Sequence, residues 1–476
     1  MTKLEIYHIY SIMILELDIH NQFKESISRY KNHDPHLKRL IELPLVYHSP
    51  LLEEPAFNIP GIYLITGGRQ IGKTTFLKQL ILRLLSKKAA PKNILFLTGE
   101  IIDTHHILRQ IIDRFYDSSS SHQYLIIDEV NYIPDWDKSV KYLADSGILE
   151  KTTVILTGSD SKIIQTAMKR FAGRRGKADK TDFIFSPLSF KEFAVLKNKE
   201  IAPLCSKIIN TPLTDKLPEY SQSHALLIEL FYEYLLHGGY LPAINEYAQK
   251  NTLSASTMNT YIHWIIGDIL KYNKSEHHLH EILRGIETTY NTPISWNSLS
   301  KHLSIEHHQT VSDYCDILSS THVLHIQQAI QEHKLTGAPK KNRKLYFRDP
   351  FIHHSVSRYL NPEFSVDKIK SQLRNNEFAS KYVEAVIVDH CKRMAPTYYI
   401  KGSKGEVDIA LVQQKTMLPV EIKWTKRIRP EDLKQIQTYK NGIILTQTPQ
   451  TRMINTNIVL PLIRFLVHID DNQVVL

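Results

Sequence analysis

The sequence contains little cysteine and no long apolar run. Its three cysteines, Cys205, Cys315 and Cys391, are far apart and form neither a CxxC pair nor an obvious disulfide framework. We therefore expect a reducing compartment, because disulfide-stabilised proteins carry regularly spaced cysteines. The apolar stretch 9–15 is too short to cross a bilayer and lacks the cationic flank and cleavage site of a signal peptide. These absences predict a cytoplasmic protein without a membrane partner.

Histidine motifs for metal binding are also absent. The chain has 24 histidines but no HExxH, and pairs such as His277-His278 and His307-His308 have no partners at ligand spacing. Surface histidines explain these pairs better than a zinc site does.

The chain is long and carries a net positive charge. Its 476 residues predict two to four domains. Its formal net charge of +10 favours an anionic partner such as DNA. Charge of this size excludes little by itself, so the function has to be sought in motifs.

One decapeptide, residues 66–75, carries the clearest chemistry. Its sequence TGGRQIGKTT satisfies G-x-x-x-x-G-K-[ST]. The apolar run Ile62–Ile65 precedes it, and helix-forming residues 76–81 follow. This strand–loop–helix order is the context that the motif needs to bind nucleotide phosphates.

The residue types in this loop fit ATP and Mg²⁺. Glycines let the backbone curl until successive N–H groups face one anion, and the following helix adds its positive end. Lys73 can reach the β- and γ-phosphates, and the Thr74 hydroxyl can hold Mg²⁺. The predicted nucleotide-binding residues are Gly67, Gly68, Arg69, Gln70, Ile71, Gly72, Lys73, Thr74 and Thr75.

Short apolar runs alternate with helical stretches from residue 61 to about 193. The runs are Ile62–Ile65, Ile94–Leu97, Leu125–Ile127, Val154–Leu156 and Phe183–Phe185. Continuous apolar runs fit strands buried on both faces, hence a parallel sheet covered by helices. The predicted fold class is α/β, with the phosphate loop beyond the carboxyl ends of the strands.

The third run ends in two acids, Asp128 and Glu129. At the carboxyl end of a parallel strand they point into the same crevice as the phosphate loop. Asp128 can bind the Mg²⁺ shell, and Glu129 can orient and activate the attacking water. A strand running into a polar turn would explain the acids alone, but beside the phosphate loop they predict hydrolysis.

Two features after the fourth run are candidates for phosphate sensing. The Ser159 hydroxyl can contact the γ-phosphate, although a turn at Gly158 explains the pattern equally well. A basic cluster follows, made of Lys162, Lys169, Arg170, Arg174, Arg175, Lys177 and Lys180. It is either a solvated loop or the source of an arginine finger, with Arg174 ahead of Arg175. Two arrangements are compatible with such a role for Arg174. In an oligomer it would contact the phosphate bound by a neighbouring subunit, and in a single chain it would contact its own ATP when the chain closes on it.

Several of these motifs together resemble a known group. The matching segments are Gly67–Thr75, Ile126–Val130, Asp135-Trp136, Thr157–Ser159, Ala172–Gly176 and Pro187–Phe193. The sequence resembles the prokaryotic AAA+-type (P-loop) ATPases that carry an uncharacterised C-terminal domain related to restriction endonucleases. One departure is Gly68, where this group usually has proline. The resemblance covers nearly the whole chain beyond residue 58 and implies architecture more than biological role.

A helix-turn-helix pattern lies between Ile294 and Leu324. Two short apolar-periodic segments, around Leu299 and over Thr310–Leu318, flank a turn at Ser304-Ile305. Segments 323–326 and 344–347 then suit wing strands. Winged helices bind DNA through the second helix, but they also serve as packing modules, and this helix has no arginine or lysine. The wing loop, with Lys340, Lys341, Arg343 and Lys344, is the better candidate for phosphate contact.

The C-terminal part carries a carboxylate pattern typical of PD-(D/E)xK nucleases. Two strands, 406–410 and 419–424, hold Asp408, Glu421 and Lys423 in the spacing D-x₁₂-E-x-K, and Glu384 lies on the preceding helix. If the strands form a hairpin, Glu384, Asp408 and Glu421 would hold Mg²⁺, and Lys423 would align a water molecule. A salt-bridged solvent face would give the same spacing.

Gln435 and Tyr439, on an expected helix, resemble the Q-x-x-x-Y element of RecB-type nucleases and favour the nuclease-like fold. Such folds either cut DNA or persist as inactive binding scaffolds.

The predicted organisation has five parts. They are residues 1–58, a lead-in; 59–200, an AAA+-like ATPase core; 201–290, a helical region; 291–350, a winged helix; and 351–476, a restriction-endonuclease-like domain. The predicted function is an ATP-driven switch or motor acting on DNA. The alternative is a nucleotide-gated regulatory protein whose C-terminal domain binds DNA or protein without cleavage. A small-molecule kinase is disfavoured, because Asp128-Glu129 suits water activation.

Overall fold

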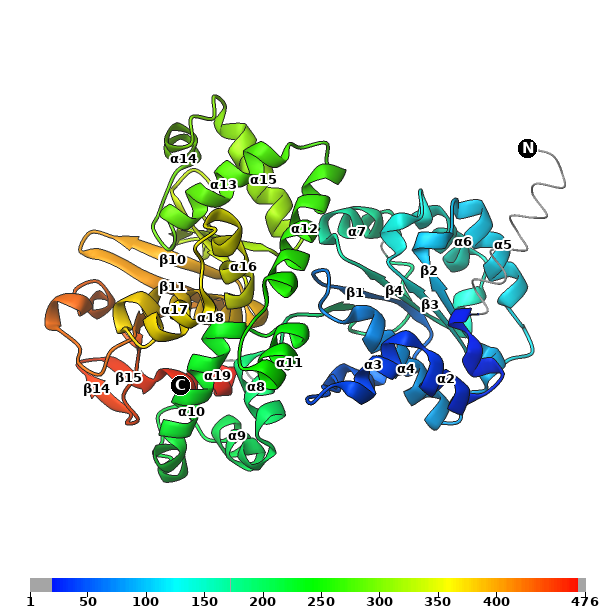
Figure 1. The fold of residues 1–476 in the computed structure, drawn as a ribbon, viewed down its shortest axis with the longest axis horizontal. Helices are drawn as coiled ribbons and strands as arrows, with labels where there is room; N and C mark the ends of the chain where they lie inside the picture. Colours follow the sequence, from blue (N-terminus) through cyan, green and yellow to red (C-terminus); the bar gives the residue numbers. More distant parts are fainter. Residues whose placement is uncertain (1–18, 172, 470–476) are drawn as a thin grey trace. The chain divides into compact units, whose positions relative to one another are not determined.

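The structure is a computed structural model that describes residues 19–171 and 173–469 (Figure 1). The chain divides into two compact units, Met1–Ser186 and Pro187–Leu476. The predicted segments 201–290, 291–350 and 351–476 all fall within the second unit. The apolar stretch 9–15 and Ala172 lie outside the described residues.

The first unit is built on a parallel sheet of five strands in the order β2-β3-β4-β1-β5. The strands are β1 Gly61–Thr66, β2 Ile94–Thr98, β3 Gln123–Asp128, β4 Thr152–Gly158 and β5 Asp182–Ile184. Each coincides with one of the five predicted apolar runs. The prediction of a parallel α/β sheet is therefore confirmed.

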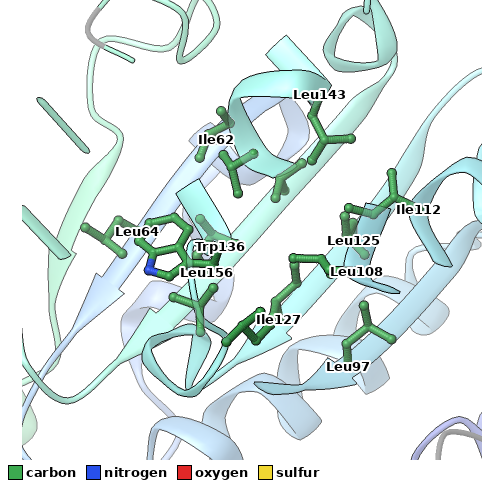
Figure 2. Close-up of a cluster of buried hydrophobic side chains, with 14 of the residues drawn as sticks. Ile62, Leu64, Leu97, Leu108, Ile112, Leu125, Ile127, Trp136, Leu143 and Leu156 are labelled. Atoms are coloured by element: carbon green, nitrogen blue, oxygen red, sulfur yellow. The ribbon is translucent and has the colours of Figure 1, made fainter. Parts of the chain in front are cut away.

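Side chains alternate along each strand and so point to both faces of the sheet. Both faces are buried under hydrophobic cores. Ile62 and Leu64 of β1 face a core that includes Trp136 (Figure 2). Tyr63 and Ile65 face the opposite core. The helices of this unit are α2 Ile27–His33, α3 Pro35–Glu42, α4 Lys73–Ser86, α5 His105–Phe115, α6 Trp136–Asp145 and α7 Ser161–Met168.

The described part of the lead-in packs on the sheet and on α4. Asn21 caps β2, an edge strand, by donating to the Phe96 carbonyl and accepting from the Phe96 N–H, both at 2.9 Å. Asp34 begins α3 and forms an ion pair at 3.2 Å with Lys78, a buried residue of α4. A lead-in that showed no chemistry in sequence therefore anchors the helix that follows the phosphate loop.

Helices dominate the start of the second unit. They are α8 Phe190–Lys197, α9 Ala202–Asn210, α10 Pro218–His237, α11 Leu241–Lys250, α12 Ala255–Lys271 and α13 Glu276–Thr288. The turn between α10 and α11 is held by Asp349, whose carboxylate accepts the Gly239 N–H at 2.8 Å. Gly238 there has φ +62°, a backbone conformation that favours glycine.

Two helices and a strand pair follow, in the expected order. They are α14 Trp296–His302, α15 His308–Ser320, β6 Leu324–Gln328 and β9 Arg343–Phe347. β6 and β9 pair antiparallel, with Gln327 opposite Lys344. The short strands β7 Ile330–Gln331 and β8 Thr336–Gly337 lie between them in sequence, and α16 Pro350–Leu360 comes next.

The last part of the unit is a mixed sheet of six strands in the order β10-β11-β12-β13-β15-β14. The strands are β10 Thr397–Gly402, β11 Gly405–Gln413, β12 Thr416–Lys423, β13 Ile443–Thr446, β14 Arg452–Ile454 and β15 Asn457–Pro461. The associated helices are α17 Val366–Gln372, α18 Asn376–Met394 and α19 Leu462–Ile469. Within residues 19–171 and 173–469, no helix combines the length and apolarity needed to cross a membrane.

Candidate nucleotide site and acidic cluster

The phosphate loop connects β1 to α4 and needs glycine at two positions. A Cβ on Gly67 would lie 2.2 Å from the Phe185 carbonyl oxygen, so only glycine lets β5 approach. Gly72, which precedes α4, has φ +101°. The loop therefore delivers the N-terminus of a 14-residue helix to the carboxyl edge of the sheet, where unpaired N–H groups and the helix dipole favour an anion.

Lys73 is buried at this edge and is held entirely by oxygens. Its Nζ donates to the carbonyls of Gly67 and Gly68, both at 3.0 Å. It also forms an ion pair with Glu129 Oε1 at 3.2 Å. Because the side chain is only 4% exposed, the ammonium depends on these partners in place of water.

Asp128 joins three elements of the site. Its Oδ2 accepts from the Thr74 hydroxyl of α4 at 2.6 Å, and its Oδ1 accepts from the Thr157 hydroxyl of β4. The Thr74 hydroxyl and the Asp128 carboxylate are both oxygen ligands of the kind that Mg²⁺ takes at nucleotide sites, together with substrate phosphates. The residues present therefore fit the ion.

Glu129 is positioned through its backbone and its side chain. Its φ of +48° is uncommon outside glycine. Its N–H donates to the Thr157 hydroxyl at 2.9 Å, and its Oε2 accepts from Ser159 at 3.2 Å. Thr157 thus orients both acids. From the segment Thr157–Ser159 the sequence analysis selected Ser159 and gave Thr157 no role. The position of Thr157 at the end of β4, the strand next to β3, could have indicated that it lies beside Asp128.

Arg174 lies at the other edge of the same sheet. Its neighbour Arg175 accepts the Ile62 N–H at 2.9 Å through its carbonyl, at the beginning of β1, and β1 spans roughly 17–20 Å at about 3.3 Å per residue. Arg174 forms an ion pair at 2.9 Å with Asp145, and its side chain is 47% exposed. Arg175 forms an ion pair with Asp182. The structure therefore does not bring either arginine to the phosphate loop of its own chain.

The second centre is the acidic cluster, which we define as Glu384, Asp408 and Glu421. β11 and β12 pair antiparallel with Ile409 opposite Val420. Asp408 and Glu421, the next residues along the two strands, therefore lie beside each other on the opposite face of the sheet. Asp408 Oδ2 accepts the Ile422 N–H at 2.9 Å, and Lys423 forms an ion pair with Glu421 at 2.7 Å. The exposures of the Asp408 and Glu421 side chains are 16% and 6%, so this face is not the solvent face of a hairpin.

Glu384 extends from α18 toward the same place and is fully paired. Oε1 accepts from Lys344 at 3.1 Å and from the Tyr346 hydroxyl at 2.7 Å, and Oε2 accepts from the Asn291 amide at 3.0 Å. Burial raises the pKa of Glu384, with the Asp408 charge acting in the same direction. Sequence reasoning did not identify Lys344, Tyr346 or Asn291 as neighbours, because they are distant in the chain.

Glu421 retains one oxygen without a partner. Its Oε2 is buried and accepts no hydrogen bond. Burial, followed by repulsion from Asp408, raises its pKa from 4.5 to about 8. At neutral pH this carboxyl therefore binds a proton that an exposed glutamate would have lost.

The acidic cluster does not fit the Mg²⁺ predicted for it. Five of its six carboxylate oxygens already accept from donors of the protein, and three of the five accept from lysine ammonium groups, whose positive charge opposes a cation. Across the described part of the chain, no group of three or more histidine, cysteine, aspartate or glutamate residues has an arrangement suited to a metal ion. We therefore derive no metal-dependent step at this centre.

Two further expectations differ from the structure. Arg343 and Lys344 are 7% and 3% exposed, so they do not belong to an exposed wing loop; Lys340 and Lys341 are exposed. Gln435 and Tyr439 lie around two short 3₁₀ turns, not on a helix. Gln435 Oε1 accepts the Lys404 N–H at 2.9 Å, so it braces the turn between β10 and β11.

Two family profiles match parts of the chain. Residues 60–194 match the family described as an AAA domain, and residues 228–363 match a domain of unknown function (DUF8612). An uncharacterised protein of Haemophilus influenzae is 24% identical over 271 residues, which cover 54% of this chain and 60% of that protein. The uncharacterised protein MJ1544 of Methanocaldococcus jannaschii is 29% identical over 165 residues, covering 33% and 34%. The chain thus spans less than two thirds of the length of either relative.

Solved structures show a partial likeness. The Walker-type ATPase paby2304 of Pyrococcus abyssi has a TM-score of 0.41 at 14% identity, covering 64% of this chain and 93% of that one. The ORC2 protein of Aeropyrum pernix has a TM-score of 0.35 at 11% identity, covering 71% and 92%. Residues 60–194, which match the AAA-domain profile, contain the five strands of the parallel sheet.

The raised pKa of Glu421 predicts a pH-dependent stability. A carboxyl whose pKa is raised from 4.5 to about 8 stabilises the fold fully below pH 4.5 and loses that contribution as pH rises to 8. Glu421→Gln resembles the protonated form at every pH. Its stability relative to the original protein should therefore rise between pH 5 and pH 8.5, by up to about 4 kcal/mol, since one pKa unit corresponds to about 1.4 kcal/mol.

Urea unfolding of the second unit at both pH values measures this difference. Glu363→Gln, at an exposed glutamate of the same unit, is the matched control and should show little change. A Glu421→Gln difference that is flat or falls with pH would contradict the assignment.

Proposed function

We propose that residues 59–200 bind ATP with Mg²⁺ and hydrolyse it, in a protein that acts on DNA or is regulated by it. The observation that supports hydrolysis is the convergence of Lys73, Thr74, Asp128 and Glu129 at one edge of the sheet, with contacts of 2.6–3.2 Å. Binding alone would require the loop and the lysine. The paired acids add a means of activating water.

The residues divide the work as follows. ATP phosphates lie at the N-terminus of α4, and Lys73 exchanges its Glu129 partner for them. Thr74 and Asp128 would hold Mg²⁺. A bound Mg²⁺ would supply positive charge beside the phosphates. Glu129, once released from Lys73, accepts a proton from the attacking water, and Thr157 keeps both acids oriented. Ser159 remains a candidate for contact with the γ-phosphate.

DNA as the partner is supported by charge. The chain carries a net charge of +10. Exposed cations occur at Lys169, Arg170, Lys177 and Lys180 of the first unit and at Lys334, Lys340 and Lys341 of the second. Basic surfaces of this kind neutralise phosphates without reading sequence. The alternative function, a nucleotide-gated regulator that binds DNA or protein without cleavage, uses the same surfaces.

A second candidate function is DNA cleavage by the acidic cluster. It is favoured by the approach of Glu384, Asp408 and Glu421 with Lys423, in the order that PD-(D/E)xK nucleases share. It is opposed by the donors that already occupy the cluster's oxygens. The regulatory alternative, in which the winged-helix and nuclease-like segments bind without cutting, agrees better with this arrangement.

Arg174 is proposed as a finger only between chains. Its place at the amino edge of the sheet and its half-exposed side chain support contact with the nucleotide of a second copy. The protein would then be a homo-oligomer when active.

A cytoplasmic location is proposed as well, supported by Cys205, Cys315 and Cys391, which are all buried and free of disulfides.

ATP turnover tests the nucleotide site. Lys73→Ala should abolish ATP hydrolysis. Thr157→Val should lower kcat about 10–100-fold with a smaller effect on KM, because residues that orient ligands contribute about that much. Thr152→Val is the matched control: it makes the same change at the other end of β4, where the buried hydroxyl has no partner. Turnover that survives Lys73→Ala, or falls equally in both threonine variants, would refute the assignment.

DNA binding tests the second half of the proposal. The double variant Lys340→Gln, Lys341→Gln should weaken binding to a short duplex regardless of sequence. It should also reduce the slope of log affinity against log salt by about 1–2, because each lost phosphate contact removes about 0.9.

The double variant Lys368→Gln, Lys370→Gln, at two exposed lysines on α17, removes the same charge and controls for net charge. Fluorescence anisotropy at several salt concentrations gives the slope. Absence of duplex binding even at low salt, or a control variant equal to the double variant, would exclude this surface as the DNA contact.

A further inference from the structure

Lys344 occupies the centre of the acidic cluster. Its Nζ lies 3.1 Å from Glu384 Oε1, 3.4 Å from Asp408 Oδ1 and 3.9 Å from Glu406 Oε2. The ring of Tyr399 closes a further side, with its centroid 5.7 Å from the ammonium. The side chain is 4% exposed. A lysine from β9 therefore fills the space between carboxylates that belong to α18 and β11.

The strand pair β6–β9 is held in this position by hydrogen bonds of Tyr346 and Gln327. Tyr346, two residues after Lys344 and on the same face of β9, donates to Glu384 Oε1 and to Gln327 Oε1. The Gln327 amide donates to the carbonyls of Tyr398 and Asp408, at 3.0 and 3.1 Å. Both strands of the hairpin thus bind the cluster, and Lys344 is delivered by an ordered element.

Ammonium groups already offset much of the negative charge of the cluster. Lys344 forms ion pairs with Glu384 and Asp408, and Lys423 forms one with Glu421. Burial alone would lower the pKa of Lys344, but attraction to Glu384 and Asp408 outweighs it and raises that pKa well above its ordinary value, so the ammonium is permanent.

We propose that Lys344 is the built-in cation of the acidic cluster and keeps divalent metal ions out of it. A divalent ion at the oxygens of Glu384 and Asp408 would have to lie beside the ammonium that those oxygens now bind. Like charges at such a distance repel strongly in a buried site. The cluster is thus a closed structural centre while β9 is in place. This inference goes beyond the proposed ATPase and does not depend on it.

Removing the ammonium should create a metal site. In Lys344→Met, whose uncharged side chain is one atom shorter than lysine, Glu384 Oε1 and Asp408 Oδ1 lose the ammonium beside them. Glu421 Oε2 has no partner to begin with. Carboxylate oxygens in this number suit Mn²⁺. The full chain without nucleotide is titrated with Mn²⁺, and free ion is counted by electron paramagnetic resonance. Every sample carries Asp128→Asn, which removes any contribution from the nucleotide site.

The original chain should bind no Mn²⁺ at the cluster, whereas Lys344→Met should bind about one equivalent and gain thermal stability with Mn²⁺, as expected for a ligand of the folded state. Adding Asp408→Asn to Lys344→Met should abolish this binding. Lys344→Arg retains a positive charge and should bind none. Lys423→Met removes the peripheral ammonium and leaves Lys344 in place, so it should also bind none.

Two results would overturn the proposal. One is an equivalent of Mn²⁺ bound by the chain with Lys344 intact and lost on Asp408→Asn. The other is a folded Lys344→Met, judged by circular dichroism, that binds no more Mn²⁺ than its parent. If Lys344→Met fails to fold, Lys344→Gln, which still donates to Glu384, takes its place under the same two criteria.

Discussion

A buried lysine ammonium surrounded by oxygens is the interaction on which both centres of this chain depend. Lys73 and Lys344 are each about 4% exposed. In place of water, Lys73 has one carboxylate and two carbonyls, and Lys344 has carboxylates and an aromatic ring of its own unit. An ammonium removed from water without such partners would destabilise the fold by several kcal/mol. The two sites differ in what can replace the carboxylate. Lys73 lies at the N-terminus of a 14-residue helix, where an anion is favoured, whereas Lys344 lies among carboxylates and beside the Tyr399 ring.

The parallel sheet explains how the nucleotide site is assembled. Adjacent strands β3 and β4 end at the same edge as β1, which brings Asp128, Glu129 and Thr157 to the phosphate loop. The same geometry separates Arg174 from that loop, since residues 174–176 lie against the beginning of β1. The proposed hydrolysis within one chain and the proposed contact of Arg174 with a second copy therefore involve opposite edges of one sheet.

The parts predictable from sequence were those with a local signal. Continuous apolar runs predicted all five strands of the first sheet, and the loop motif together with Asp128-Glu129 predicted residues that the fold brings into contact. The surroundings of Glu384 could not be predicted, because Asn291, Lys344 and Tyr346 meet it only through long-range packing. A lysine in a basic stretch is normally solvated, and nothing local distinguishes Lys344 from Lys341. The spacing of Gln435 and Tyr439 predicted a helix, but the two residues flank a 3₁₀ turn, which hydrophobic periodicity does not reveal. Gln435 instead supports the turn between β10 and β11 by accepting the Lys404 N–H.

The proposed hydrolysis requires the Lys73 ammonium to leave the Glu129 carboxylate and to pair with a phosphate of ATP. Equilibrium binding of ATP to Glu129→Gln tests it most directly. Because the variant no longer forms an ion pair with Lys73, it should bind ATP more tightly than the original chain, by about tenfold or 1.4 kcal/mol, while its turnover is lost. Weaker or unchanged ATP binding together with retained hydrolysis would contradict both roles of Glu129.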